Sequence, residues 1–405
     1  MNILIIDAYF APEIIGFTHL EHDILEGLIR AGHRVTVVCP TPSRGIPKET
    51  AIKYKSIRHE TIDGVEVYRY WAPIEGRNPI IRAFRYFWCN LRGNRVGRRF
   101  RDTDVIFAVS TPPTQGLFVG KLAKKLKVPF VYSLQDVFPD SLVTTGMTTN
   151  NSWLYRIGAW VEKKTYLLCS RVIVLSHSVE RNLLDKGVPQ SKLLTVSNWI
   201  DAEEVHPVPK EDNRLFEEFD IDRSKFNVVY AGNFGASQGA GVILEAAKLL
   251  KDDDSIRFVI FGGGAEFEQA KEIVRQEQLQ NVIINPLLPM DRVSEVYSLG
   301  DVSIITCKKG VGGIAMPSKL WSIMACGTPI IAAFDTDSEL ADVLKASGAG
   351  VCIEPEDPKQ LADAIKKHSR RQSGKTNSRE YVKNNADKLI CSQRYVSCIE
   401  AAADK

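Results

Sequence analysis

Short apolar runs alternate with amphipathic segments along almost the whole chain. The first half opens with an apolar run at residues 2–10, an amphipathic segment at residues 18–32 and a second apolar run at residues 33–40. The short runs predict buried strands, and the amphipathic segments predict helices. Strand–helix alternation of this kind is typical of parallel sheets that helices cover on both faces.

The alternation is interrupted once, at residues 199–222, where prolines and acids gather and no strand is predicted. We therefore predict an N-terminal Rossmann-like domain at residues 1–200, a linker at 201–216 and a second Rossmann-like domain at 217–385. Two such α/β domains are expected to face a cleft in which the ligand binds at the strand ends. Residues 386–405 predict a further helix that crosses back to pack on the N-terminal domain.

Composition narrows the class of protein. The chain has 405 residues, of which 44% are hydrophobic and 25% charged, and its net charge is +3. No apolar run approaches the ~20 residues that cross a bilayer, and residues 1–10 lack the basic start of a signal peptide. The eight cysteines include no CxxC pair, which indicates reduced, buried thiols rather than a cysteine metal site. We therefore expect a cytoplasmic protein.

Residues 77–101 differ from this average, with eight arginines, no acid and five interleaved aromatic residues. They could form a surface helix that packs its aromatic face on the core, or an interfacial helix whose arginines meet anionic lipid headgroups. We favour the second interpretation. The residues that we expect at the membrane are Arg82, Arg85, Trp88 and Arg92. Gly93 and Gly97 argue against one unbroken helix. Nothing else along the chain resembles a nucleic-acid module, so no nucleic-acid partner is expected.

Four predicted strands are followed by loops rich in small residues, at residues 9–19, 231–241, 261–268 and 313–332. Gly16 in the first loop opens a helix, where a glycine lets a phosphate approach backbone amides. No loop has the GxGxxG spacing of a nicotinamide site, and the chain has neither a Walker P-loop nor a GxSxG elbow. The pattern therefore indicates a nucleotide-linked substrate held without a metal motif.

Several of these segments carry a family resemblance. "YFAPEIIG", "VPFVYSLQDVFPD", "VVYAGNFGASQG", "FVIFGGGAEFEQ" and "MPSKLWSIMACGTPII" follow one another in the order found in the retaining glycosyltransferases of family 4. The resemblance covers nearly the whole chain and implies the two-domain GT-B fold. The chain most resembles the L-fucosamine and related amino-deoxysugar transferases of O-antigen and capsule assembly.

The chain also departs from the family pattern. Two glutamates separated by seven residues flank the family's donor loop, and by register they fall at Ile314 and Ser322 here. The family's Arg and Lys in the "AGN" loop correspond to Asn233 and Gln238. We read these departures as features of a subgroup rather than as signs of inactivity. The resemblance implies donor and diphosphate contacts by Gly16, Asn233, Gln238, Pro317, Ser318, Lys319 and Ser322.

The resemblance implies a reaction without a metal ion or cofactor. Backbone amides at Ser318 and Lys319, the dipole of the helix beginning there and the Lys319 ammonium would hold the diphosphate. The departing phosphate would help remove the acceptor proton. Asp136 is the polar candidate near the reacting centre, although it could instead cap a helix. The candidates on the acceptor side are Glu13 and His19.

Two of these roles have ordinary alternatives. Lys319 could be a solvated helix lysine, and Ser322 could bond its own backbone instead of a ribose. The predicted function is transfer of a sugar from a UDP-linked donor to a lipid-linked glycan in O-antigen or lipopolysaccharide assembly, on the inner face of the cytoplasmic membrane. A nucleotide-sugar epimerase and a non-catalytic sugar-nucleotide binding protein stay as alternatives.

Overall fold

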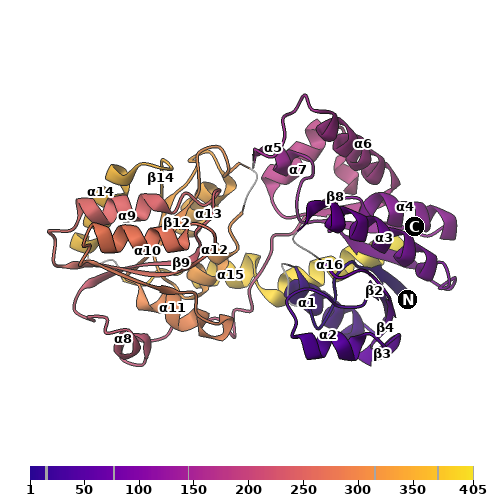
Figure 1. The fold of residues 1–405 in the computed structure, drawn as a ribbon, viewed down its shortest axis with the longest axis horizontal. Helices are drawn as coiled ribbons and strands as arrows, with labels where there is room; N and C mark the ends of the chain where they lie inside the picture. Colours follow the sequence, from indigo (N-terminus) through magenta and orange to yellow (C-terminus); the bar gives the residue numbers. More distant parts are fainter. Residues whose placement is uncertain (14–16, 76–77, 145, 314–315, 372–373, 405) are drawn as a thin grey trace. The chain divides into compact units, whose positions relative to one another are not determined.

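The computed structural model describes residues 1–13, 17–75, 78–144, 146–313, 316–371 and 374–404. The chain divides into two compact units (Figure 1). Unit 1 comprises residues 1–198 and 391–405, and unit 2 comprises residues 199–390. The predicted α/β fold with two sheets is confirmed, and each unit is described by itself below.

Unit 1 contains an eight-stranded sheet in the order β3-β4-β2-β1-β5-β6-β7-β8. All neighbouring strands are parallel except the edge pair β3 and β4, which is antiparallel. Every residue of β5 and β6 is buried, as expected where helices cover both faces of a parallel sheet. The strands are β1 (Asn2–Ile6), β2 (Arg34–Pro40), β3 (His59–Ile62), β4 (Val65–Tyr70), β5 (Val105–Val109), β6 (Phe130–Leu134), β7 (Arg171–Val174) and β8 (Leu193–Thr195).

Two helices of unit 1 have side-chain N-caps. Ser152 and Ser176 cap α6 and α7, because each side chain accepts a hydrogen bond from an amide of the first turn. The helices are α1 (Thr18–Arg30), α2 (Lys48–Tyr54), α3 (Pro79–Gly97), α4 (Gln115–Leu126), α5 (Asp140–Thr144), α6 (Trp153–Leu168) and α7 (His177–Asp185), with a 3-10 turn at Gln190–Lys192. None of the helices that the structure describes is long and apolar enough to cross a membrane.

Helix α3 runs without a break to Gly97, so the expected interruption at Gly93 and Gly97 was wrong. Packing explains the difference. A Cβ at Gly97 would lie 2.8 Å from the Leu122 side chain, and one at Gly93 would lie 3.3 Å from the Ile6 side chain. The two glycines therefore let α3 approach α4 and the sheet closely, and this contact outweighs their low helix propensity.

The last helix, α16 (Lys388–Ala403), packs on unit 1 from Cys391 onward. The Tyr395 hydroxyl lies 3.1 Å from the Ser133 hydroxyl of β6, and Glu400 Oε1 lies 2.8 Å from His33 Nε2. Tyr395 and Cys391 are fully buried. The C-terminal segment thus completes the core of the unit that begins the chain.

Unit 2 contains a fully parallel six-stranded sheet in the order β11-β10-β9-β12-β13-β14. Neighbouring residues of β9 point to opposite faces: Val228 joins one buried apolar cluster and Val229 the other. The strands are β9 (Phe226–Asn233), β10 (Ile256–Gly263), β11 (Val282–Pro286), β12 (Val302–Thr306), β13 (Ile330–Ala333) and β14 (Gly350–Ile353).

Helices cover both faces of this sheet. They are α8 (Leu215–Glu218), α9 (Gly241–Leu249), α10 (Phe267–Gln276), α11 (Val293–Leu299), α12 (Lys319–Ala325), α13 (Glu339–Ser347), α14 (Pro358–Arg371) and α15 (Ser378–Asn385), with a 3-10 turn at Met290–Arg292. Because the strands are parallel, the loops after β9, β10 and β12 emerge at one edge of the sheet.

Candidate functional site

The end of β9 and the start of α12 meet at a lysine. Lys319 Nζ lies 4.1 Å from the centroid of the Tyr230 ring on β9. A Cβ at Gly232 would lie 2.2 Å from that Nζ atom, a distance that real Cβ atoms do not show. Only glycine at position 232 therefore lets the Lys319 ammonium rest against the β9 backbone.

The Lys319 side chain is partly buried, and the protein atoms around its ammonium group desolvate it and lower the pKa of Lys319 to about 8. Among the residues that the structure describes, no carboxylate forms an ion pair with it. The expected alternative of a solvated helix lysine is therefore wrong. A desolvated ammonium without a counter-charge is poised to bind an anion.

Two amide side chains lie in the loop that follows Gly232. Asn233 follows Gly232 directly, and its Nδ2 lies 3.4 Å from Gln238 Oε1. The loops leave no room for larger neighbours, because a Cβ at Gly264 would lie 1.9 Å from Asn233 Oδ1 and one at Gly235 would lie 2.7 Å from Gln238 Oε1. The structure thus brings Asn233 and Gln238 together next to the residue that cradles Lys319.

The rest of the predicted donor loop follows α12. Ser318 precedes the helix without a side-chain cap, and α12 has only seven residues. So short a helix adds little dipole, and the site depends on the ammonium more than we expected. Pro317 is partly exposed, and its carbonyl accepts from the Leu320 amide at 3.0 Å. Ser322 is buried one turn inside α12, and Ile314 lies outside the described residues.

Sequence reasoning missed the residue that fixes the loop between β12 and α12. Asp335, just past β13, accepts hydrogen bonds from the amides of Gly310 at 2.9 Å and Gly312 at 2.7 Å. A Cβ at Gly312 would lie 2.5 Å from the Phe334 ring, so the loop is held close to β13. A lone aspartate after a strand gives no sequence signal for this role.

In unit 1, Asp136 follows β6 and is exposed. Neighbouring protein atoms nevertheless shield its carboxyl group and raise the pKa of Asp136, although hydrogen bonds from Ser141 and from the Val137 amide act in the opposite direction. Ser141 belongs to α5, so Asp136 supports the start of that helix through a side chain rather than as its N-cap. Its role near a reacting centre stays a prediction.

Glu13 and His19 line one cavity of about 670 Å³ in unit 1, together with Glu21 and Leu25 of α1. Glu13 is buried, and its Oε1 accepts from the amides of Ser43 at 2.7 Å and Arg44 at 2.8 Å, which gives it a structural task. His19 is exposed at the start of α1. Gly16, the predicted glycine of the first loop, lies outside the described residues.

A buried acid pair lies beneath this cavity. Burial raises the pKa of Asp7 to about 6, and burial together with the charge of Asp7 raises the pKa of Glu21 further. The two side chains share a hydrogen bond, and Gln115 bonds Asp7 as well. In both carboxyl groups, burial therefore favours the protonated form. Its sequence signal is weak, because Asp7 follows an apolar strand and Glu21 sits among surface acids of α1.

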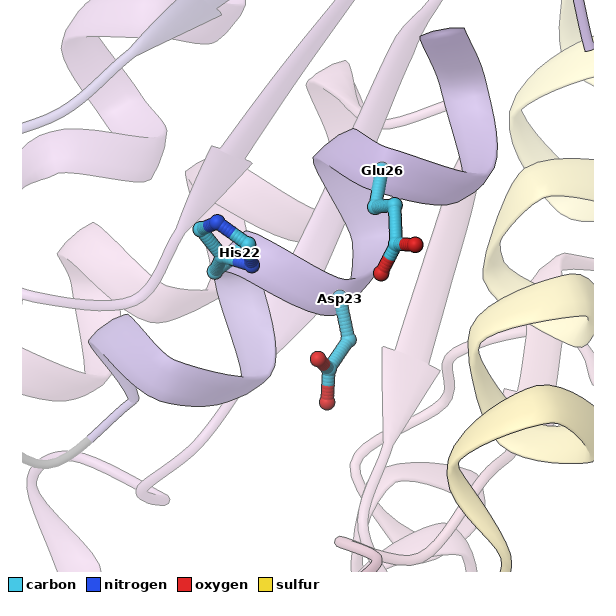
Figure 2. Close-up of side chains that lie close together, drawn as sticks. All are labelled: His22, Asp23 and Glu26. Carbon is cyan, nitrogen blue, oxygen red and sulfur yellow. The ribbon is translucent and has the colours of Figure 1, made fainter. Parts of the chain in front are cut away.

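The described residues offer one group with the spacing of a metal site, on α1. Ligand atoms of His22, Asp23 and Glu26 all lie within 4.8 Å of one another (Figure 2). Glu26 is paired with Arg30 at 2.6 Å, and His22 lies 3.4 Å from Asp63. Because the group lies at the surface and two members have other partners, we assign no metal site to it.

Helix α3 carries the residues predicted at a membrane, and one of them is misplaced. Arg85 is fully buried, donates to the Pro73 carbonyl at 2.7 Å and lies 5.6 Å from the Tyr9 ring centroid. It cannot reach a lipid headgroup, so that part of the prediction was wrong. Arg82 is exposed, while Arg92 is partly buried with its guanidinium 5.5 Å from the Trp88 ring centroid. The Trp88 indole donates to the Trp71 carbonyl at 3.0 Å.

The surface-helix interpretation requires the apolar stripe of α3 to pack on the core. Trp88 does pack against the core, but the rest of the stripe is exposed. Phe84, Phe87 and Leu91 are 56%, 54% and 45% exposed.

Comparisons with known proteins agree with the two-unit architecture. Residues 21–199 match the family described as glycosyl transferase 4-like domain, and residues 211–389 match the family described as glycosyl transferases group 1.

Two relatives from bacteria are similar in sequence. The probable glycosyltransferase WbjE of Pseudomonas aeruginosa is 26% identical over 75% of this chain and 76% of its own length. The putative colanic acid biosynthesis glycosyl transferase WcaI of Escherichia coli K12 is 24% identical over 98% of this chain and all of its own length.

Among solved structures, Anabaena Alr3699/HepE in complex with UDP is similar, with a TM-score of 0.73 over 99% of this chain and all of that chain at 14% identity. At this identity the likeness shows the fold, which is GT-B.

Proposed function

We propose that this chain, whose residues 21–199 match the glycosyl transferase 4-like domain and whose residues 211–389 match the glycosyl transferases group 1 family, is a glycosyltransferase that transfers a sugar from a UDP-sugar to a lipid-linked glycan with retention of configuration. The observation that carries this proposal is the desolvated ammonium of Lys319, which is held against Gly232 and has no carboxylate partner among the described residues. The similar fold of HepE, which was solved with UDP, supports a uridine donor.

The donor site binds the diphosphate through one charge and two amides. A nucleoside diphosphate supplies the negative counter-charge for the Lys319 ammonium. The Asn233 and Gln238 side chains can add neutral hydrogen bonds. Lys319 then stabilises the charge that grows on the departing phosphate as the glycosidic bond breaks. Ser318 and Pro317 shape the loop beside it, and Ser322 is proposed to contact the ribose. Because Lys319 supplies the counter-charge, the reaction needs no divalent metal and no cofactor.

The chemical step balances without a strong protein base. The bond between the anomeric carbon and the phosphate oxygen breaks, and the acceptor oxygen bonds the same face of that carbon. The acceptor hydroxyl gives its proton to the departing phosphate. Asp136 is proposed near this centre, and Glu13 and His19 on the acceptor side, where their cavity has room for a sugar.

The acceptor is proposed from the relatives and from α3. WbjE and WcaI are described as a probable glycosyltransferase and a putative colanic acid biosynthesis glycosyl transferase, which supports a role in bacterial surface-polysaccharide assembly. A donor such as UDP-N-acetyl-L-fucosamine, or a related amino-deoxyhexose, fits the sequence resemblance. The exposed aromatic residues of α3, with Arg82 beside them, support the proposal that the enzyme acts while bound to the inner face of the cytoplasmic membrane.

The test is an acceptor-dependent assay of UDP release. Purified protein is incubated with a panel of UDP-sugars and GDP-sugars, with and without polyprenyl-diphosphate-linked glycan, in EDTA. We expect UDP release only with acceptor, and an anomeric configuration in the product that matches the donor. Sugar conversion without acceptor would instead identify an epimerase, and a strict Mg²⁺ requirement would contradict the metal-free site. Binding of UDP without turnover of any sugar would indicate a non-catalytic protein.

A further inference from the structure

Three neighbouring helices of unit 1, α3, α4 and α6, form a layer with a one-sided charge. The layer is continuous because α4 contacts both α3 and α6 (Figure 1). Their sequences contain ten lysines and arginines but a single acid, Glu162. Glu162 is buried and bonds Lys186 at 2.9 Å. Among the charged residues of these three helices, the outward side therefore carries cations only.

Close packing fixes α6 in this layer. A Cβ at Gly116 of α4 would lie 2.3 Å from the Thr165 side chain of α6, and one at Gly120 would lie 2.7 Å from the Leu168 side chain. The side of α6 that faces α4 is thereby settled. The opposite side carries large apolar residues at helical spacing that the described residues leave exposed: Trp153 is 73% exposed, Ile157 52%, Trp160 53% and Leu167 64%.

A second exposed stripe runs along α3. Ile81, Phe84, Phe87 and Leu91 are between 45% and 56% exposed and recur every three or four residues. Isolated apolar residues on a surface are ordinary, but two stripes on one helical layer are not.

A groove of about 600 Å³ lies between α3 and α4. Four cations line it, namely Arg92, Arg95, Arg98 and Lys121, beside the rings of Trp88 and Phe118. Among the residues that the structure describes, none of these four cations has a carboxylate partner. The groove is held in shape by Asn94, whose Nδ2 donates to the Phe118 carbonyl at 2.6 Å. Its chemistry is that of a phosphate site with apolar walls.

We propose that this layer is a membrane-docking face in which the groove between α3 and α4 binds the phosphate of an anionic phospholipid and the stripes of α3 and α6 enter the interface. The inference rests on the proposed function only for its setting, because the docking face contains no residue of the donor site. Charge complementarity selects the occupant, since cations without acids favour an anionic surface over a protein of mixed charge. Helix α6 is the new element, because the charge pattern of residues 77–101 points to α3 alone.

The experiment is co-flotation of the purified full chain with vesicles of phosphatidylcholine alone or with 30% phosphatidylglycerol. We compare three variants: Trp153→Ser/Trp160→Ser in α6, Arg95→Glu/Arg98→Glu/Lys121→Glu in the groove, and Ile52→Ser/Lys53→Glu as control. The control changes an exposed isoleucine and a lysine on α2. We expect the wild type and the control to float with anionic vesicles only, and the first two variants to lose at least about tenfold in partition coefficient.

Other outcomes would overturn the inference. Equal flotation on neutral vesicles would remove the headgroup site, and unchanged flotation of the α6 variant would remove α6 from the face. If the wild type does not float with any vesicle, the layer is not a membrane-docking face, and a protein partner would be the alternative occupant. UDP affinity and thermal unfolding are measured on the same samples. Unchanged UDP binding in a variant that no longer floats would separate docking from donor binding, so the two proposals can fail independently.

Discussion

Replacing Lys319 with methionine should stabilise the unliganded protein while it destroys the donor site. Burial lowers the pKa of Lys319 from its ordinary 10.5 to about 8. At about 1.4 kcal/mol per pH unit, this difference means that folding disfavours the charged side chain by about 3 kcal/mol. Loss of the cation–π contact with the Tyr230 ring reduces this gain in stability by about 0.5–1 kcal/mol. Lys319→Met, which keeps the length and the apolar stem, should therefore gain about 2 kcal/mol in unfolding free energy at pH 7.

The pH dependence gives the same prediction a second readout. Below pH 8 the amine is charged in both the folded and the unfolded state, and the full penalty applies. Between pH 8 and about 10.5 the folded protein carries a neutral amine while the unfolded chain stays charged, so the wild type gains stability relative to the variant. Urea unfolding of both proteins at pH 7 and pH 9.5 measures this difference. A variant that is no more stable than the wild type at pH 7 would refute the claim that Lys319 is a desolvated cation.

Three further outcomes follow from the same structure. Gly232→Ala should displace the Lys319 ammonium and lower UDP affinity at least about tenfold, whereas Gly241→Ala, with open space at its Cβ, should leave binding unchanged; equal effects in calorimetry would contradict the cradle. Asp335→Ala should free the Gly310 and Gly312 amides and raise the KM for the donor without changing the fold, and an unchanged KM would show that the loop needs no such anchor. Because the pKa of Asp7 is raised to about 6 from 3.8, the free energy of unfolding of the wild type should decrease as the pH rises from 4 to 6. Asp7→Asn should abolish this decrease in urea titrations, and an unchanged pH profile would contradict the prediction.

The sequence was sufficient for the fold because its apolar runs are short, continuous and separated by amphipathic segments, a pattern that suits only strands and helices in alternation. It was not sufficient for the continuity of α3. Helix propensity argued for a break at Gly93 and Gly97, but propensity is weak beside the close contacts that these glycines allow with Ile6 and Leu122.

Some site residues could likewise be identified from the sequence, and others only from the structure. The loop that carries Lys319 could be found, because glycines and small residues after a strand are a local pattern. Its partner Gly232 could not be chosen from the several glycines nearby, because only the tertiary structure shows where the long lysine side chain returns. Arg85 was misplaced for the opposite reason. Its charge suggested solvent, and only the structure shows the Tyr9 ring, the Pro73 carbonyl and Glu75 around it.

The most direct test of the donor site is calorimetric titration of UDP and uridine into the wild type and Lys319→Met at pH 7. Uridine lacks the diphosphate and serves as the internal control for the base and the ribose. We expect the variant to lose at least about tenfold in UDP affinity, as for removal of a charged hydrogen-bond donor, while uridine binds both proteins equally. Equal UDP affinity in the two proteins would contradict the assignment of Lys319 as the diphosphate anchor.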